Sequence, residues 1–240
     1  MNSSLIRFFV LIAILKLLLH NNYLGEILAS PLLTILSLLS IIIALVIHEF
    51  AHALAADKLG DPNPRLAGRL SLNPLKHLDP IGTLLIIIAG FGWGKPVAFD
   101  PYNLAKPERD GALIALAGPI SNFLLWAICL LLLVLSDNQL LLAFMGEQLW
   151  WIKTFLFRLM IINFSLGIFN LMPVYPLDGH HVLRALLSDQ PRRYYDYFNQ
   201  RFGYIFILLI LFVPIGNTTI VNACLNPIYQ LMLSLTKHIL

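Results

Sequence analysis

Residues 31–58 read PLLTILSLLSIIIALVIHEFAHALAADK, a stretch that stays apolar for most of its length. Ser30 followed by Pro31 favours a helix start, because proline is preorganised for the first helical position, and Gly60 with Pro62 favours a stop. The stretch therefore predicts one helix of roughly 29 residues and about 44 Å. That length exceeds the hydrocarbon thickness of about 30 Å, so we expect a helix that crosses a membrane with tilt or with a protruding end.

The composition of the whole chain is equally unsuited to water. The 240 residues are 58% hydrophobic and 12% charged, with a mean hydropathy of +0.78, whereas soluble domains are about half apolar and about a quarter charged. The 16 basic residues are spread thinly instead of forming a patch, which argues against nucleic acid as a partner. Cys129 and Cys224 lie in apolar segments without C-x-x-C spacing, and we interpret both as buried hydrophobic residues.

Further apolar runs predict additional membrane spans. They comprise residues 1–20, interpreted as an uncleaved first span and not a cleaved signal, and residues 111–135, 150–171, 202–213 with their flanks, and 216–235. The run of residues 81–91 is too short to cross and ends in glycines, which predicts a re-entrant or interfacial segment. We therefore expect an all-α polytopic membrane protein with about six transmembrane helices, a small β-like segment on the cytoplasmic side, and one domain over residues 1–240.

The basic residues predict how these spans are oriented. An N-terminus in the cytoplasm places 13 of the 16 basic residues on the cytoplasmic side. These are Arg7, Lys58, Arg65, Arg69, Lys76, Lys95, Lys106, Arg109, Arg184, Arg192, Arg193, Arg201 and Lys237. The positive-inside rule then predicts a multi-pass protein of the cell membrane with a cytoplasmic N-terminus and active-site side.

Residues 48–52 read HEFAH and carry the chemistry of the long helix. Spacing by four residues puts His48 and His52 on one helix face, where two imidazole nitrogens can bind one zinc ion. Glu49 sits within the apolar span, where an ionisable group is costly and indicates function. The helix rise places His52 about 8 Å and His48 about 14 Å below the cytoplasmic interface. The alternative is a pair of interfacial histidines with an isolated glutamate.

A catalytic zinc commonly has three protein ligands, so a third ligand must come from elsewhere. Residues 170–179 read NLMPVYPLDG and predict a turn on the same side of the membrane, which makes Asp178 eligible. Without the histidine pair, Asp178 is more typical of the N-cap of a following helix. His180 and His181 are competing ligands, and Glu108 ranks last because its neighbours are charged.

Several stretches in order resemble the site-2 protease family of intramembrane zinc metalloproteases, in its compact bacterial and archaeal form. The matching stretches are HEFAHALAADKLGD from His48, GRLSLNPLKHLDPIGT from Gly68, GFGWGKPV from Gly90, ALAGPISN from Ala115 and FNLMPVYPLDGHHVL from Phe169. The resemblance covers about residues 40–190. It leaves no space for a PDZ insertion or a C-terminal regulatory domain, so we expect neither.

The resemblance implies roles for individual residues. It implies that His48, His52 and Asp178 bind one Zn²⁺ and that Glu49 is the catalytic acid/base. It also implies that Asn170 assists near the reacting carbonyl. Without the resemblance, Asn170 would be interpreted as a helix C-cap or a loop residue. These roles predict a zinc metalloendopeptidase.

Substrate and alternatives follow from the same resemblance. It implies hydrolysis of peptide bonds in or near transmembrane segments of membrane-protein or signal-peptide substrates within the lipid bilayer. Residues 90–99 are glycine-rich and suit an edge to which an unwound substrate adds as a strand, with a plain interfacial loop as the alternative. Asn122 also matches a position of the family pattern. The alternative role for Asn122 is that of a polar packing residue. A membrane zinc transporter or metal sensor is the competing function, and Glu49 disfavours it because transport needs ligands and no base.

Overall fold

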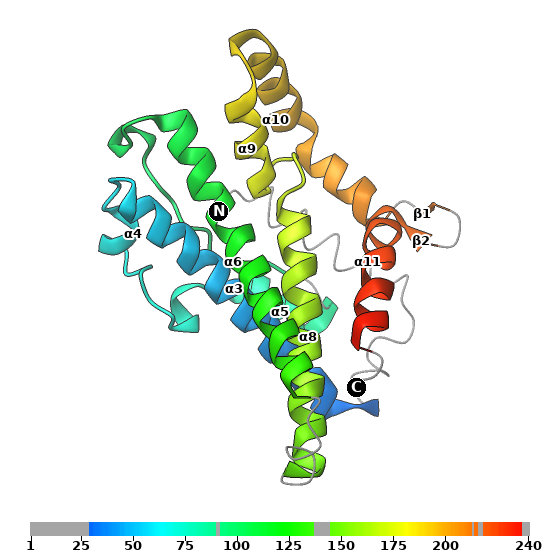
Figure 1. Ribbon diagram of the computed structural model, residues 1–240. Coiled ribbons are helices and arrows are strands. Elements are labelled where there is room, and N and C mark those ends of the chain that lie inside the picture. Colours follow the sequence, from blue (N-terminus) through cyan, green and yellow to red (C-terminus); the bar gives the residue numbers. More distant parts are fainter. Residues whose placement is uncertain (1–28, 90–91, 137–144, 213, 216–217, 237–240) are drawn as a thin grey trace. The chain divides into compact units, whose positions relative to one another are not determined.

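The computed structural model describes residues 29–89, 92–136, 145–212, 214–215 and 218–236, and these are mostly helical (Figure 1). Its elements are α3 (Pro31–Lys58), α4 (Asn63–Leu66), η1 (Pro74–Lys76), α5 (Pro80–Ala89), η2 (Pro101–Asn103), α6 (Pro107–Leu135), α8 (Glu147–Asn170), α9 (Asp178–Leu186), α10 (Asp189–Phe212), β1 (Pro214–Ile215), β2 (Thr218–Thr219) and α11 (Ile220–Thr236). The chain divides into two compact units, residues 1–114 and 115–240, with the boundary inside α6. The predicted helical class is confirmed.

Helix α3 begins and ends where the local sequence predicts. Pro31 is its first residue, and Gly60 just beyond its end has a φ of 111°, a conformation that glycine adopts without a Cβ clash. The buried carboxylate of Asp61 then accepts hydrogen bonds from the amide of Asp100 at 2.7 Å and from the side-chain amide of Asn103 at 2.8 Å. These bonds tie the segment before α6 to the end of α3.

The short apolar run before the glycine-rich stretch forms α5, a helix of 10 residues and about 15 Å, which is too short to cross a membrane, as predicted. The chain then returns along it at very close range. A Cβ on Gly92 would collide with the carbonyl oxygen of Gly82, so only glycine permits this backbone contact. Gly94 makes an isolated antiparallel bridge with Leu78. Residues 92–99 form no longer ladder, and a β-like role for them stays a prediction.

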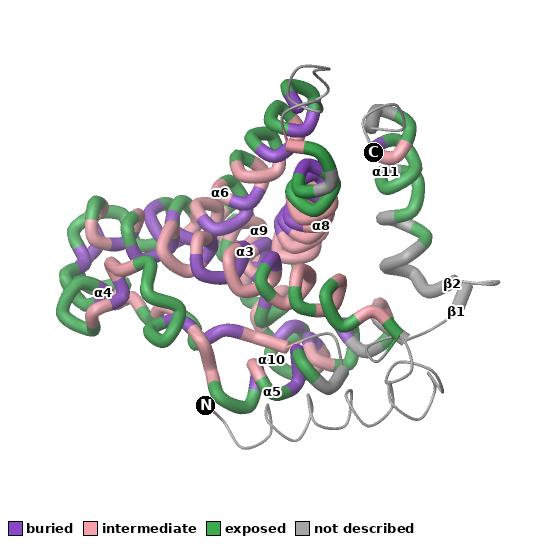
Figure 2. The backbone as a smooth tube through the Cα atoms, turned by 90° about the horizontal axis from the view of Figure 1, so that it is seen from below, coloured by how far each residue is buried: buried purple, intermediate pink, exposed green. Residues whose placement is uncertain are grey.

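Three helices in the described part of the chain are long and apolar enough to span a membrane. They are Pro31–Lys58, Pro107–Leu135 and Gln148–Asn170. Large apolar side chains are exposed along them: on α6, Leu124 and Leu131 are 61% and 58% exposed. Figure 2, which colours the backbone by burial, shows exposed stretches along α6. A soluble protein rarely exposes such a surface, whereas lipid accommodates it.

The remaining predicted spans have different outcomes. The span at residues 1–20 lies outside the described residues. The stretch of residues 202–213 belongs to α10, whose first half is charged, and the last stretch forms the 17-residue α11. With 24 residues α10 is long enough but is not among the helices apolar enough to span a membrane, and α11 is shorter than all three spans above. The number six therefore stays a prediction.

Within the second unit, α6 and α8 share a buried polar contact. Asn122 and Asn163 are fully buried, and the side-chain amide of Asn122 donates to the Asn163 oxygen at 2.8 Å. Nearby, the Phe123 ring packs so closely on Gly167 that a Cβ there would lie 3.0 Å from the ring. A paired amide between apolar helices stabilises their association. This contact favours the packing role for Asn122.

Replacing Asp61 tests the connection between α3 and the segment before α6. Asp61→Ala leaves the buried donors of Asp100 and Asn103 without their acceptor, which we expect to cost about 2–4 kcal/mol and to lower the thermal unfolding midpoint of the detergent-solubilised protein by at least about 4 °C. The matched control is Asp189→Ala, since Asp189 is 91% exposed, and its midpoint should not change. Equal midpoints for Asp61→Ala and wild type would refute this role.

Candidate metal centre

Two imidazoles face each other one turn apart in α3. His48 and His52 are 6% and 8% exposed, and their ring planes cross at 89°. Their Nε2 atoms lie 3.0 Å apart. A tetrahedral zinc ion with Zn–N distances of about 2.0–2.1 Å separates two nitrogen ligands by about 3.4 Å. A small ring rotation therefore lets both nitrogens reach one ion, so the donor set fits the predicted metal.

A backbone acceptor fixes the protonation of one of these rings. The Nδ1 of His52 lies 2.7 Å from the carbonyl oxygen of Ile114. Because a carbonyl only accepts, we assign the proton to Nδ1, which leaves the Nε2 lone pair to a metal. Ile114 is itself packed in a small buried cluster with Ala56 and Leu104. The packing around Ile114 in the first unit thus sets the orientation of the His52 ring.

Glu49 lies beside the histidine pair on α3 and is partly exposed. Its Oε2 accepts a hydrogen bond from the amide of Val97 at 3.2 Å. This donor was absent from the sequence-based expectations, because a backbone N–H has no side-chain signature. The only signal was the extended, glycine-rich character of residues 90–99.

Asp178 belongs to the second unit, where it opens α9. Leu177 is the N-cap residue of that helix, so Asp178 is the first helical residue and the N-cap alternative is wrong. A Cβ on Gly179 would collide with the carbonyl oxygen of Leu171, so glycine is required for α9 to start this close to the end of α8. The local fold thus fixes where the carboxylate is attached, and its role as a ligand stays a prediction.

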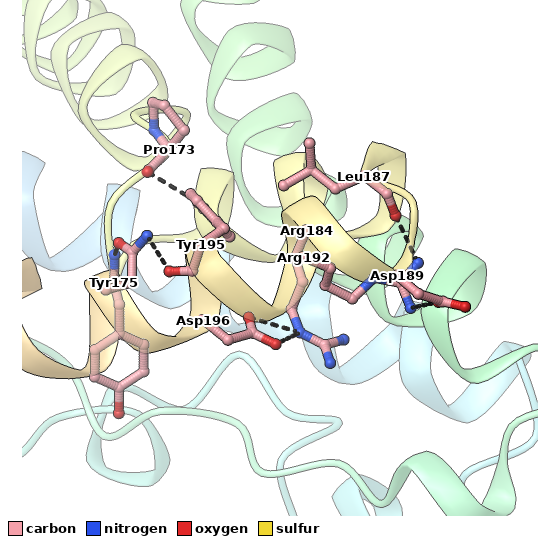
Figure 3. A network of polar contacts seen from close by, with 9 residues as sticks. Pro173, Tyr175, Arg184, Leu187, Asp189, Arg192, Tyr195 and Asp196 are labelled. Carbon is pink, nitrogen blue, oxygen red and sulfur yellow. Dashed lines mark hydrogen bonds and ion pairs between the residues drawn. The ribbon is translucent and has the colours of Figure 1, made fainter.

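The loop between α8 and α9 is held by the first half of α10 (Figure 3). The Tyr195 hydroxyl donates to the carbonyl oxygen of Pro173 at 2.9 Å, and the amide of Tyr175 donates to the buried side-chain oxygen of Asn199 at 2.9 Å. Burial, with a smaller contribution from Asp196, raises the pKa of Tyr195 to about 12. The phenol therefore stays protonated and keeps donating at neutral pH.

The competing ligands have other environments. His180 is buried and its ring stacks on Tyr195 with centroids 5.1 Å apart. Burial first, and the neighbouring His181 second, lower the pKa of His180 to about 4, so its ring is neutral at pH 7. His181 and Glu108 are exposed. Stacking gives His180 a packing role, and Asp178 stays the preferred third ligand.

Asn170 is the last residue of α8. Its side-chain amide donates to the carbonyl oxygen of Leu166, one turn back, at 3.0 Å. That bond uses one of the two amide hydrogens and directs the side chain along its own helix. The expected role near a reacting carbonyl therefore requires the second hydrogen of the Asn170 amide.

Comparisons with known proteins agree with this chemistry. The profile described as peptidase family M50 matches residues 36–213. The chain is 37% identical over 186 residues to YwhC of Bacillus subtilis, named as a candidate zinc metalloprotease, covering 75% of this chain and 81% of that protein. It is 29% identical over 180 residues to Rip2 of Mycobacterium tuberculosis, which bears the same description, covering 73% and 66% respectively. No solved structure matches the chain.

Removing either imidazole tests the pair as a metal site. His48→Ala or His52→Ala should lower the metal content of the purified protein from about one ion per chain to below about 0.2, because each removes one ligand of a single ion. Elemental analysis provides the measurement. His181→Ala is the matched control on an exposed histidine and should keep its metal. Full metal content in either of the first two variants would rule out the pair.

Proposed function

The chain belongs to peptidase family M50, and we propose that it is an intramembrane zinc metalloprotease that cuts peptide bonds in or near transmembrane segments of its substrates. The observation that carries this proposal is the pair of Nε2 atoms 3.0 Å apart in a helix long and apolar enough to span a membrane. Glu49 lies directly beside that pair. Family membership supports the metalloprotease class, and the apolar spans support a membrane-embedded site.

We propose that His48, His52 and Asp178 together hold one zinc ion. The set offers two imidazole nitrogens and one carboxylate oxygen, a combination that catalytic zinc sites use while leaving a position open. The names of the relatives, which include zinc metalloprotease, support zinc as the metal. When bound, zinc supplies Lewis-acid activation of water and of the substrate carbonyl.

The side chains of this chain then handle the protons and the developing charge. Glu49 takes a proton from the attacking water and delivers it to the departing amine, and the Val97 amide holds its carboxylate in place at 3.2 Å. The second amide hydrogen of Asn170 donates to the oxyanion of the tetrahedral intermediate. The attacking water reaches the site through protein-lined polar space, because lipid supplies none.

A substrate in a transmembrane helix hides its carbonyls in backbone hydrogen bonds, so it must unwind before attack. We propose that residues 92–99 receive the unwound peptide as an added strand. Their backbone is not helical, and the isolated bridge between Gly94 and Leu78 supports this role. Membrane-protein segments and signal peptides are the substrates with the required chemistry.

We further propose six transmembrane helices in one metalloprotease domain over residues 1–240, with the N-terminus and the active site on the cytoplasmic side of the cell membrane. Three apolar helices support part of this count. The distribution of basic residues supports the orientation, since 13 of the 16 fall on one side. The lipid bilayer is then the immediate partner of the protein, and nucleic acid is not a partner.

A membrane zinc transporter or metal sensor would use the same histidines without hydrolysis. Transport or sensing needs ligands that exchange, and it has no use for a base. The carboxylate of Glu49 is held by the Val97 amide and is not assigned to the metal, as expected for a proton acceptor. This observation favours hydrolysis.

Replacing the base separates these functions. Glu49→Gln should keep about one zinc per chain and reduce cleavage of a single-span test substrate at least about 100-fold, because the amide cannot accept the proton. Glu108→Gln, which neutralises an exposed glutamate, should keep both zinc and cleavage. Product analysis by mass spectrometry gives the rates, and undiminished cleavage by Glu49→Gln would exclude the hydrolytic assignment.

A further inference from the structure

Arg69 carries a guanidinium that is almost completely buried. The residue lies just beyond α4 and is 7% exposed, although burial of an arginine charge is costly unless its donors are satisfied. Its Nη1 donates to the carbonyl oxygens of Lys76 at 2.6 Å and Lys95 at 3.0 Å, and its Nη2 donates to that of Pro96 at 3.3 Å. Among the described residues no carboxylate pairs with it. The buried cation therefore binds backbone from two separate segments.

The neighbouring backbone is anchored independently. The amide of Lys95 donates to the carbonyl oxygen of His77 at 2.7 Å, and Gly94 bridges to Leu78. His77 is fully buried, and its Nε2 bonds the carbonyl oxygen of Ser71 at 2.6 Å. The chain that leads to Pro96 is thus held before it reaches Arg69. In this segment Arg69 therefore acts on two successive peptide groups, Lys95–Pro96 and Pro96–Val97, and not on the whole segment.

The second of these peptide groups joins Pro96 to Val97, and it is hydrogen-bonded at both ends. Its carbonyl oxygen accepts from Arg69, and its N–H donates to Oε2 of Glu49 at 3.2 Å. The peptide is trans, so its C=O and N–H point in opposite directions. A cation at the oxygen and a carboxylate at the hydrogen both follow the peptide dipole, and each strengthens the other bond.

We propose that Arg69 is a positioning residue for the acid/base: it orients the Pro96–Val97 peptide group, and the Val97 N–H then holds the Glu49 carboxylate in one rotamer. The inference rests on the proposed function, in which Glu49 moves the proton. A glutamate has three side-chain torsions, and a displacement of about 1 Å at a reacting group is enough to cost about 100-fold in rate.

The first test compares arginine variants of the full chain on a single-span test substrate. Arg69→Met should lower kcat roughly 10- to 100-fold, while KM changes less than about threefold and zinc stays at one per chain, because the ligands do not depend on this peptide group. Arg69→Lys should recover part of kcat, since its ammonium reaches one carbonyl. The matched control is Arg65→Met, which removes an arginine that is 66% exposed and should leave kcat unchanged.

The second test removes the amide hydrogen itself. Val97→Pro deletes the donor to Glu49 and keeps the carbonyl oxygens that accept from Arg69, whereas Val97→Ala keeps the donor. Val97→Pro should lose kcat as Arg69→Met does, and Val97→Ala should keep at least about tenfold more kcat than Val97→Pro. Because both changes break one chain of contacts, Arg69→Met combined with Val97→Pro should lose no more than either alone.

The outcomes separate this inference from the function on which it rests. Full kcat in Arg69→Met or Val97→Pro, with Glu49→Gln inactive, overturns the positioning role and leaves the protease assignment standing. Multiplying losses in the double variant also overturn it, because Arg69 would then act by another route. If Arg69→Met fails to fold, equal kcat in Val97→Pro and Val97→Ala overturns it. A wild-type protein that cuts nothing overturns both.

Discussion

The hydrogen bond between Nδ1 of His52 and the carbonyl oxygen of Ile114, at 2.7 Å, is the contact on which the metal centre depends. It commits the ring proton to one nitrogen and frees the other for a metal, as an outer partner of a metal ligand does. The acceptor is backbone, so no additional polar side chain has to be buried in an apolar helix. The cluster of Ala56, Leu104 and Ile114 keeps that carbonyl in place.

The need to satisfy a buried polar group with a hydrogen bond also explains how other such groups are arranged. A polar group away from water must find a partner, and here the partner is often backbone. Arg69 donates only to carbonyl oxygens, and Asp61 accepts two of its hydrogen bonds from backbone amides. Backbone partners are fixed by the path of the chain, so the close contact between Gly82 and Gly92 has consequences beyond α5. It sets the course of the segment that carries the Val97 amide to Glu49.

The part of this arrangement that depends on local sequence was predictable. The ends of α3 follow from Pro31 and Gly60, and the facing imidazoles follow from the helical period. The amide of Val97 and its contact with Glu49 were not predictable, because they need the tertiary path of residues 92–97 and involve no side-chain motif. The alternative N-cap role of Asp178 misses by one residue, since Leu177 is the N-cap, and this is the usual uncertainty of a helix end. The stacking of His180, a competing ligand ranked behind Asp178, on Tyr195 was not predictable either, because it depends on the packing of α10.

Anomalous diffraction at the zinc edge, from crystals of the zinc-loaded protein, tests the proposed ligand set most directly. The expected result is one anomalous peak per chain, bonded at about 2.0–2.2 Å to Nε2 of His48, Nε2 of His52 and a carboxylate oxygen of Asp178. Glu49 should lie close to the ion without binding it. A peak bonded to His180 or His181 in place of Asp178, or a peak away from the α3 histidines, would contradict the proposed centre.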